Sequence, residues 1–253
     1  MLDLMHPLLP RAKIRLYVDQ PLRHGQETVL TQEHAHYLVN VLRQGVGARI
    51  ALFNGRDGEW LAEITAAQRR RAAAHVLGPS AAQRMPPDLW LIFAPIKKAR
   101  TDFIVEKAAE LGAARIVPVQ TQFTNSERIR HDRLQAHAIE AAEQCGGTYV
   151  PEVAELQPLG PLLDTWPAGR ALIWADEALA EATPKAPMPP APAAILIGPE
   201  GGFSEAERAR LRAHPAVHAI ALGPRILRAD TAAVAALTLW QAQQGDWSCQ
   251  RPA

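Results

Sequence analysis

The sequence predicts an α/β protein in two parts, a small β-barrel domain at residues 1–82 and an α/β domain at residues 83–253. Two observations support this division. The first part contains five short runs, several with alternating apolar and polar residues, separated by turns with glycine and aspartate. The second part contains continuous apolar runs that alternate with helical stretches, which is typical of a buried parallel sheet.

The first part is expected to contain one helix among its strands. The helix starts after Thr31, whose hydroxyl can cap the first turn, and it ends before Gly45. The stretch NGRDG at 54–58 predicts a hairpin turn, because Asn, Asp and Gly tolerate positive φ. Residues 80–88 are interpreted as a linker. The expected strands are RLYVD (15–19), ETVL (27–30), ARIALFNG (48–55), EWLAEITAA (59–67) and AAAHVLG (72–78).

The second part is expected to contain five buried strands and four helices. The proline-rich stretch 183–193 can be neither helix nor central strand, and it is interpreted as an exposed loop. The expected helices cover 99–112, 130–147, 204–214 and 229–244. The expected strands are LWLIFAPI (89–96), RIVPVQ (115–120), ALIWADE (171–177), AAILIG (193–198) and HAIALG (218–223).

The composition excludes several classes of protein. With 48% hydrophobic and 21% charged residues the chain is ordinarily globular, and it has no apolar run of about 18 residues that could span a membrane. Its start does not match a signal peptide, and Cys145 and Cys249 form neither a disulfide framework nor a metal-ligand spacing. We therefore expect a cytoplasmic protein without a bound metal.

The charge is shared unevenly between the two parts. The net charge of the whole chain is only +1, but residues 1–83 hold 10 Lys and Arg against 7 Asp and Glu, which gives +3. The remaining 17 basic and 19 acidic residues give −2. This asymmetry is a weak indication of an anionic partner for the first part.

Two glycine turns follow apolar runs, LIGPEGGFSEAE at 196–207 and ALGPRILRADTA at 221–232. In the first, Ser204 and Glu207 are spaced as a capping box, so the glycines lie between a strand and a helix. Glycines at such a point let the backbone approach a ligand closely. Taken alone, the first turn is equally compatible with a simple tight connection, and its spacing matches neither a P-loop nor a dinucleotide fingerprint.

The two turns together resemble those of the RsmE family, methyltransferases that modify N-3 of a uridine in 16S ribosomal RNA of the small subunit. The resemblance covers essentially the whole chain, including KKARTDFIVEKAAELGAARIVPV, EAAEQCGGTYVPEV and HAHYLVNVLR. It implies a PUA-like barrel and then a domain of the SPOUT superfamily, with a carboxyl-terminal trefoil knot that binds S-adenosylmethionine (AdoMet). General topology rules would not predict a knot.

The resemblance further implies a homodimer formed through the knotted domain, and the alanines of the final helix are compatible with close helix packing there. Glu200 is expected to bond the ribose hydroxyls or to offset the sulfonium charge. Alternatively, it only interacts with the amino end of the next helix. The expected cofactor-binding residues are Leu196, Ile197, Gly198, Glu200, Gly201, Gly202, Leu222, Gly223, Pro224, Ile226 and Leu227.

Methylation at N-3 requires the uridine to lose a proton. Arg228 is the expected stabiliser of the anion on the flanking carbonyl oxygens, and Glu200 is a candidate base, because a guanidinium cannot act as one. An ion pair of Arg228 with Asp230 or Glu200 is the alternative. Basic positions that match the family are expected to contact RNA phosphates, namely Arg15, Arg43, Lys97, Lys98 and Lys107.

The chain departs from the family at two positions near these segments. Gly147 stands where many relatives have an arginine, and Asp230 replaces a glutamate. A member that binds RNA without catalysis would show damage in the glycine turns, and none is visible. A nucleotide-binding transferase would need a lysine beside the glycines, and no lysine follows Gly202.

Overall fold

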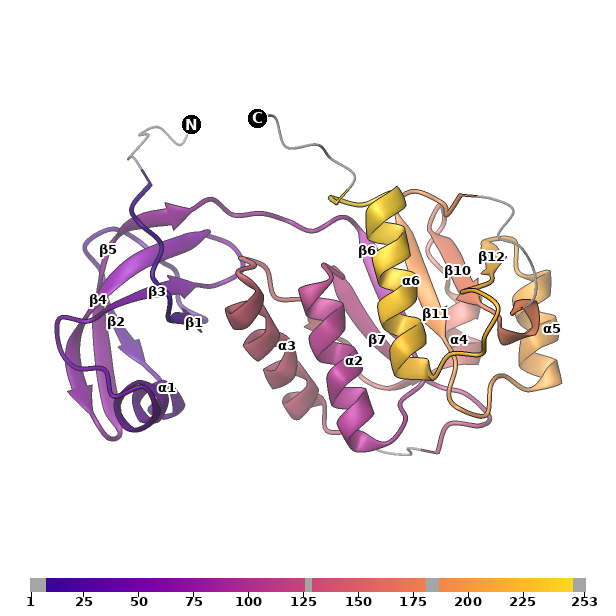
Figure 1. Cartoon of the computed structure of the whole chain (residues 1–253), viewed down its shortest axis with the longest axis horizontal. Coiled ribbons are helices and arrows are strands. Elements are labelled where there is room, and N and C mark those ends of the chain that lie inside the picture. The colour runs from indigo at the N-terminus through magenta and orange to yellow at the C-terminus, as the bar shows by residue number, and fades with distance from the viewer. Residues whose placement is uncertain (1–7, 126–128, 181–186, 248–253) are drawn as a thin grey trace. The chain divides into compact units, whose positions relative to one another are not determined.

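The computed structural model describes residues 8–125, 129–180 and 187–247, and the chain forms two compact units (Figure 1). Unit 1 comprises Met1–Met85 and Ala142–Val150, and unit 2 comprises Pro86–Ala141 and Pro151–Ala253. The sequence-based division into two continuous segments therefore missed the short segment that joins unit 1. Part of the proline-rich stretch, residues 183–186, lies outside the described residues.

Unit 1 is built on a five-stranded sheet in the order β1-β3-β4-β5-β2. All five expected strands are present, and β1 pairs with β3 in parallel while the other pairs are antiparallel. Apolar side chains such as Leu16, Leu38 and Ile50 form its buried core. The strands are β1 (Arg15–Tyr17), β2 (Glu27–Leu30), β3 (Arg49–Phe53), β4 (Glu59–Gln68) and β5 (Arg71–Ala81).

The predicted hairpin turn between β3 and β4 is confirmed. The Asn54 side chain accepts hydrogen bonds from the backbone N–H groups of Arg56 (3.0 Å) and Asp57 (2.9 Å). Gly55 and Gly58 both have φ of 79°, a conformation that favours glycine. Strand β5 continues through Ala81, so the linker that was expected at residues 80–88 starts after Ala81.

The expected helix of unit 1 changes form along its length. Thr31 caps α1 (Gln32–His36) by accepting from the His34 N–H, as predicted, and the chain continues as a π-helix, η1 (Tyr37–Val41). Arg43 then adopts φ of 54°, the left-handed conformation that usually ends a helix at glycine. The π-helix ends at Val41, with Leu42 as its C-cap residue, and so before Gly45 as expected.

Unit 2 contains a sheet in the order β12-β10-β11-β6-β7-β8, in which all pairs are parallel. The five expected strands are present, and every residue of β11 is buried. The short β8 and β9, both paired with β7, were not expected. The strands are β6 (Leu89–Phe93), β7 (Arg115–Gln120), β8 (Glu152–Val153), β9 (Gln157–Pro158), β10 (Ala171–Ala175), β11 (Ala193–Ile197) and β12 (Val217–Ile220).

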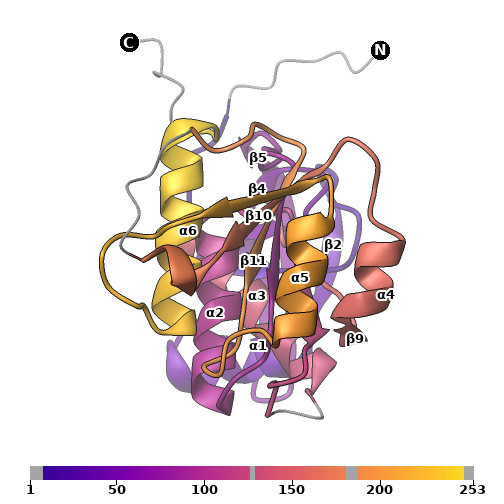
Figure 2. The same cartoon turned by 90° about the vertical axis from the view of Figure 1, so that its right-hand side faces the viewer.

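Helices cover both faces of this sheet. Figure 2 shows α2 and α6 on one face and α4 and α5 on the other. The four expected helices are present, whereas α4 and the 3-10 turn η2 were not expected. The helices are α2 (Lys98–Glu110), α3 (His131–Cys145), α4 (Leu159–Asp164), η2 (Glu177–Leu179), α5 (Glu205–Ala213) and α6 (Ala229–Gln243).

The alanine-rich face of α6 packs inside the chain. Ala232, Ala233 and Ala236 are buried, and α6 contacts α2, β6 and β11. After the edge strand β12 the chain therefore returns to the middle of the sheet, where α6 packs against β6 and β11. The expectation that these alanines serve a dimer contact is corrected, because they already form the intrachain packing.

Candidate active site

The carboxyl ends of three neighbouring strands of unit 2 surround one pocket. β10, β11 and β12 are parallel, so the turns that follow them lie at the same edge of the sheet. The pocket has a volume of about 390 Å³. The structure brings nine of the expected cofactor-binding residues together around it, namely Ile197, Gly198, Glu200, Gly201, Gly202, Leu222, Gly223, Ile226 and Leu227.

Two expected residues do not line this pocket. Leu196 is fully buried in the apolar core beside Trp174 and Phe203, because alternate residues of a strand face opposite sides of the sheet. Pro224 is exposed on the outer side of its turn and is absent from the lining. These two assignments are therefore corrected.

The glycines of the turn after β11 are closely surrounded by neighbouring side chains. A Cβ atom at Gly198 would lie 2.7 Å from the Phe203 ring, and one at Gly202 would lie 2.7 Å from Oε1 of Glu177. Gly202 also has φ of 68°. The predicted capping box is confirmed, because Ser204 and Glu207 bond each other's backbone N–H groups and fix the start of α5. Backbone groups of this turn are thereby left at the pocket surface.

The turn after β12 forms the opposite, apolar wall. Leu222 and Leu227 are half-buried, and Ile226 is 76% exposed although it is a large aliphatic side chain. Gly223 has φ of 108°, which lets the chain reverse at this point. An apolar side chain held open at a pocket rim is typical of a ligand or partner contact.

The turn after β10 contributes a carboxylate pair that the sequence-based assignment missed. Asp176 is buried and accepts from Arg208 Nη2 at 2.5 Å, while Glu177 accepts from Arg208 Nη1 at 2.7 Å. Burial by itself would lower the pKa of Arg208, but the hydrogen bonds and charges of the two carboxylates raise it. Arg208 of α5 therefore braces two of the pocket turns. The sequence signal that could have revealed this pair is the presence of two acidic residues directly after an apolar strand.

Arg228 lies at the pocket rim as the N-cap residue of α6, and its side chain is exposed. Neither Asp230 nor Glu200 forms an ion pair with it among the residues that the structure describes. Asp230 is instead bound by Arg100 of α2, with Nη1 at 3.0 Å from Oδ2. The ion-pair alternative for Arg228 is therefore not realised among the described residues.

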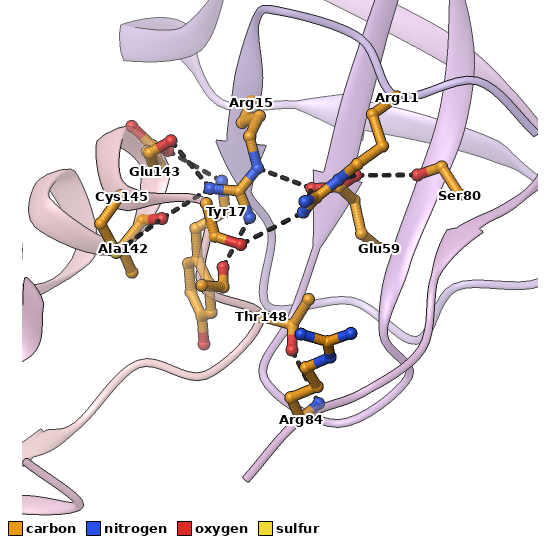
Figure 3. Close-up of polar contacts among 12 residues, drawn as sticks. Arg11, Arg15, Tyr17, Glu59, Ser80, Arg84, Ala142, Glu143, Cys145 and Thr148 are labelled. Carbon is orange, nitrogen blue, oxygen red and sulfur yellow. Dashed lines mark hydrogen bonds and ion pairs between the residues drawn. The ribbon is translucent and has the colours of Figure 1, made fainter. Parts of the chain in front are cut away.

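Arg15, expected to contact RNA, lies in a closed network of unit 1 (Figure 3). Its side chain is only 8% exposed and pairs with the fully buried Glu59 at 2.6 Å. Arg11 and Ser80 bond the same carboxylate. Burial alone would raise the pKa of Glu59, but the hydrogen bonds from Arg11 and Arg15 lower it below its usual range.

The remaining donors of Arg15 bond the end of α3. They reach the carbonyl oxygens of Ala142 (2.6 Å), Glu143 (2.8 Å) and Gly147 (2.5 Å). The last carbonyls of a helix lack partners within the helix, so a cation there satisfies them. The RNA assignment of Arg15 is corrected to a structural one. The Gly147 contact uses the backbone, so it does not depend on the side chain at this position.

The other four basic residues remain candidates for RNA contact. Arg43 is exposed in unit 1, and Lys97 and Lys98 are exposed at the start of α2 in unit 2. Lys107 is partly engaged, because its Nζ lies 2.6 Å from Glu110 and 5.5 Å from the centre of the Phe103 ring. Within the described residues, no group of three or more His, Cys, Asp and Glu side chains could hold a metal ion.

The helices of the described residues are also too short or too polar to cross a membrane.

A family model described as an RNA methyltransferase domain matches residues 83–241, and one described as an RNA methyltransferase PUA domain matches residues 30–77. The first of these models covers more than half of the chain.

Individual proteins agree with these family models. A crystal structure of ribosomal RNA small subunit methyltransferase E from Neisseria gonorrhoeae, bound to S-adenosyl methionine, is 30% identical with a TM-score of 0.83, and the match covers 92% of this chain and 99% of that one. A methyltransferase structure from Legionella pneumophila with bound SAM is 31% identical, with a TM-score of 0.82 and coverage of 92% and 98%. Ribosomal RNA small subunit methyltransferase E of Rickettsia conorii is 28% identical over 228 residues, which are 88% of this chain and 93% of the relative.

Proposed function

The chain belongs to the family of the ribosomal RNA small subunit methyltransferases E, and from this premise we propose that it transfers a methyl group from AdoMet to N-3 of a uridine in 16S ribosomal RNA. One observation carries the proposal. The pocket at the strand ends of unit 2 combines closely packed turn glycines with an arginine at its rim, Arg228, that has no ion pair among the described residues.

The pocket suits AdoMet in size and lining. Its volume of about 390 Å³ lies in the range of pockets that bury small ligands. Backbone groups of 197–202 would bond the adenine edge, and Leu222, Ile226 and Leu227 would cover its faces. The carboxylate of Glu200 favours a cationic ligand. When bound, AdoMet supplies the activated methyl group, so the protein mainly positions the reactants and excludes water.

Arg228 would act on the uridine rather than on the cofactor. The imide N–H of uridine is a weak acid, and its nitrogen becomes a good nucleophile when the proton leaves. The Arg228 guanidinium donates hydrogen bonds to the carbonyl oxygens beside N-3 and so stabilises the anion as it forms. Glu200, exposed at the same pocket, is the candidate acceptor of the proton.

The RNA would be held by cations of both units. Arg43 of unit 1 and Lys97, Lys98 and Lys107 of unit 2 would contact phosphates, which position the substrate without reading its sequence. The family model for the PUA domain, which covers most of the unit 1 sheet, supports RNA binding by unit 1.

We further propose the trefoil knot, the homodimer and the cytoplasmic location that the family resemblance implies. The return of the chain from edge strand β12 to α6, which packs against β6 and β11, supports the knot. Phe103 of α2 and Leu239 of α6 are exposed on two neighbouring helices and support a contact with a second copy. Sedimentation should give a dimer at micromolar protein, and a stable monomer that binds AdoMet would contradict it.

The decisive experiment is methylation of purified small ribosomal subunits from a strain that lacks the modification. The protein is incubated with AdoMet, and the nucleosides are analysed by mass spectrometry. We expect 3-methyluridine in 16S RNA. Naked 16S RNA in a parallel reaction tests whether the assembled subunit is required. Methylation of a different atom, or binding of AdoMet without any transfer, would contradict the proposal.

A further inference from the structure

Arg100 and Asp230 form an ion pair between the first turns of two helices in unit 2. Nη1 of Arg100 lies 3.0 Å from Oδ2 and 3.3 Å from Oδ1 of Asp230, so one amino group bridges both carboxylate oxygens. The Arg100 side chain is 33% exposed and that of Asp230 is 18% exposed. The pair is therefore only partly screened by water.

Asp230 is also fixed from its own helix. Its Oδ1 accepts from the backbone N–H of Thr231 at 3.0 Å, at the amino end of α6 where a negative charge is favourable. This places a carboxylate two residues after Arg228, which is the N-cap residue of the same helix. Asp230 is the acidic residue closest to Arg228 along the chain, and, if released from Arg100, its carboxylate would be the candidate partner of the long Arg228 side chain.

The structure resolves this competition in favour of Arg100. Among the described residues, Asp230 makes its ion pair with Arg100, and Arg228 makes none. Arg228 nonetheless lines the pocket and is exposed. The carboxylate nearest to Arg228 in the sequence is thus neutralised by a residue that does not line the pocket itself.

Building on the proposed function, we propose that Arg100 is a positioning residue for methyl transfer. It binds Asp230 and so keeps the Arg228 guanidinium free to stabilise the uridine anion. Arg100 therefore acts through Arg228 and does not itself need to touch the cofactor, the uridine or the RNA.

The proposal is tested by single-turnover methylation of small subunits at saturating RNA and AdoMet, so that weaker binding does not affect the rate. Arg100→Gln frees Asp230 to pair with Arg228, and we expect the rate to fall about tenfold, a partial loss of one preorganised donor. The double variant Arg100→Gln/Asp230→Asn lacks the competing charge, and its rate should return to within about twofold of the wild type. Arg100→Lys, which still neutralises Asp230, should also stay within about twofold.

A second cycle identifies the residue through which Arg100 acts. In an Arg228→Ala background, Arg100→Gln should slow transfer no further, because the donor that it protects is already absent. A role of Arg100 in RNA binding alone would leave all of these saturated rates unchanged. A role in helix packing would instead reduce the rate in both backgrounds. It would also leave the double variant with Asp230→Asn as slow as Arg100→Gln alone.

Arg115→Gln is the matched control. Arg115 pairs with Glu152 at 3.2 Å and is 36% exposed, so it resembles Arg100 in distance and exposure but lies on β7 and outside the pocket lining. Its rate should equal that of the wild type. Thermal unfolding and AdoMet calorimetry verify that each variant is folded. If Arg100→Gln is not, Arg100→Met, which likewise removes the charge, should show the same loss of about tenfold.

The outcomes separate the inference from the function on which it rests. If the wild-type protein transfers no methyl group, the proposed function fails. If the wild type is active but Arg100→Gln is as fast, or if Asp230→Asn does not restore the rate of Arg100→Gln, the positioning role of Arg100 is overturned while the function stands. An unchanged rate in Arg228→Ala would refute the mechanism that links them.

Discussion

Arg15 of unit 1 and Arg228 of unit 2 were both expected to contact the RNA substrate, and the structure gives them opposite surroundings. Arg15 is 8% exposed, pairs with a fully buried carboxylate and donates to three carbonyl oxygens at the end of α3. Arg228 is exposed at the pocket rim, has no ion pair among the described residues, and is flanked by an aspartate that another arginine binds.

The difference shows what separates a structural arginine from one that is available to a ligand. A guanidinium has five N–H donors, and a buried one must find acceptors for most of them within the protein. Once these acceptors are protein carbonyls and a carboxylate, few donors are left for phosphate. Arg228 has no such partners among the described residues, and Asp230, two residues further along the chain, is bound by Arg100.

Removing Arg228 should give the largest effect on the reaction. We expect Arg228→Ala to slow single-turnover methyl transfer about 100- to 1,000-fold, the range for losing one preorganised donor, with AdoMet affinity and thermal stability almost unchanged. Arg212→Ala is the control, because Arg212 is an exposed arginine of α5 outside the pocket lining. Equal rates for both variants would remove the distinction between Arg228 and an ordinary surface arginine.

Removing the charge of Glu59 should break the unit 1 network without touching the pocket. Glu59→Gln leaves Arg15 without a counterion in a buried position, and we expect a loss of about 3 kcal/mol in the free energy of unfolding. Urea denaturation measures the loss, and hydrogen exchange should locate it in unit 1. Glu63→Gln, on the same strand but partly exposed, should cost less than about 0.5 kcal/mol.

The same network gives a pH dependence with a defined sign. The pKa of Glu59 in the folded protein lies below its usual value of 4.5. Its carboxylate therefore contributes its full stabilisation above that value, and the contribution is lost as the pH falls through the lower, folded pKa. The difference in unfolding free energy between wild type and Glu59→Gln should be constant near neutral pH and shrink below pH 4.5. A difference that grows on acidification would contradict the assignment.

A substitution in the glycine turn after β11 should have a smaller effect, and only on the affinity for AdoMet. Gly202→Ala places a Cβ atom at 2.7 Å from Glu177 Oε1 and strains a φ of 68°, so AdoMet should bind about tenfold more weakly. Gly169→Ala is the matched control, because Gly169 has a similar φ of 79° but no atom within 4 Å of the added Cβ. Calorimetry should show reduced affinity only for Gly202→Ala. Equal affinity losses would attribute the effect to backbone strain in general.

Arg43 should give the smallest effect. It is exposed in unit 1, in contrast to Arg15, and one lost phosphate contact should lower the salt slope of RNA binding by about one unit. Arg43→Ala should leave the saturated transfer rate unchanged, and Arg43→Lys should preserve the slope. If Arg43→Ala slows the saturated step as much as Arg228→Ala does, unit 1 takes part in the chemistry.

Most secondary structure followed from the sequence because its signals are local. Alternating runs predicted the strands of unit 1, continuous apolar runs predicted β6, β7, β10, β11 and β12, and Ser204 and Thr31 marked helix starts. The short β8 and β9 were missed, since two residues carry no detectable periodicity. The end of the unit 1 helix before Gly45 was predicted, whereas the left-handed conformation of Arg43 was not, because it has no sequence signal.

The convergence of the two glycine turns was expected from the family resemblance, and the structure brings nine of the expected residues together around one pocket. Only the tertiary structure decided how the charged groups of the two units are paired. Arg208 meets Asp176 across 32 positions, Arg100 meets Asp230 across 130, and Arg15 meets the carbonyl of Gly147 across 132. Hydrogen bonds and ion pairs depend on distances of a few ångströms in space, and separation along the chain does not determine these distances.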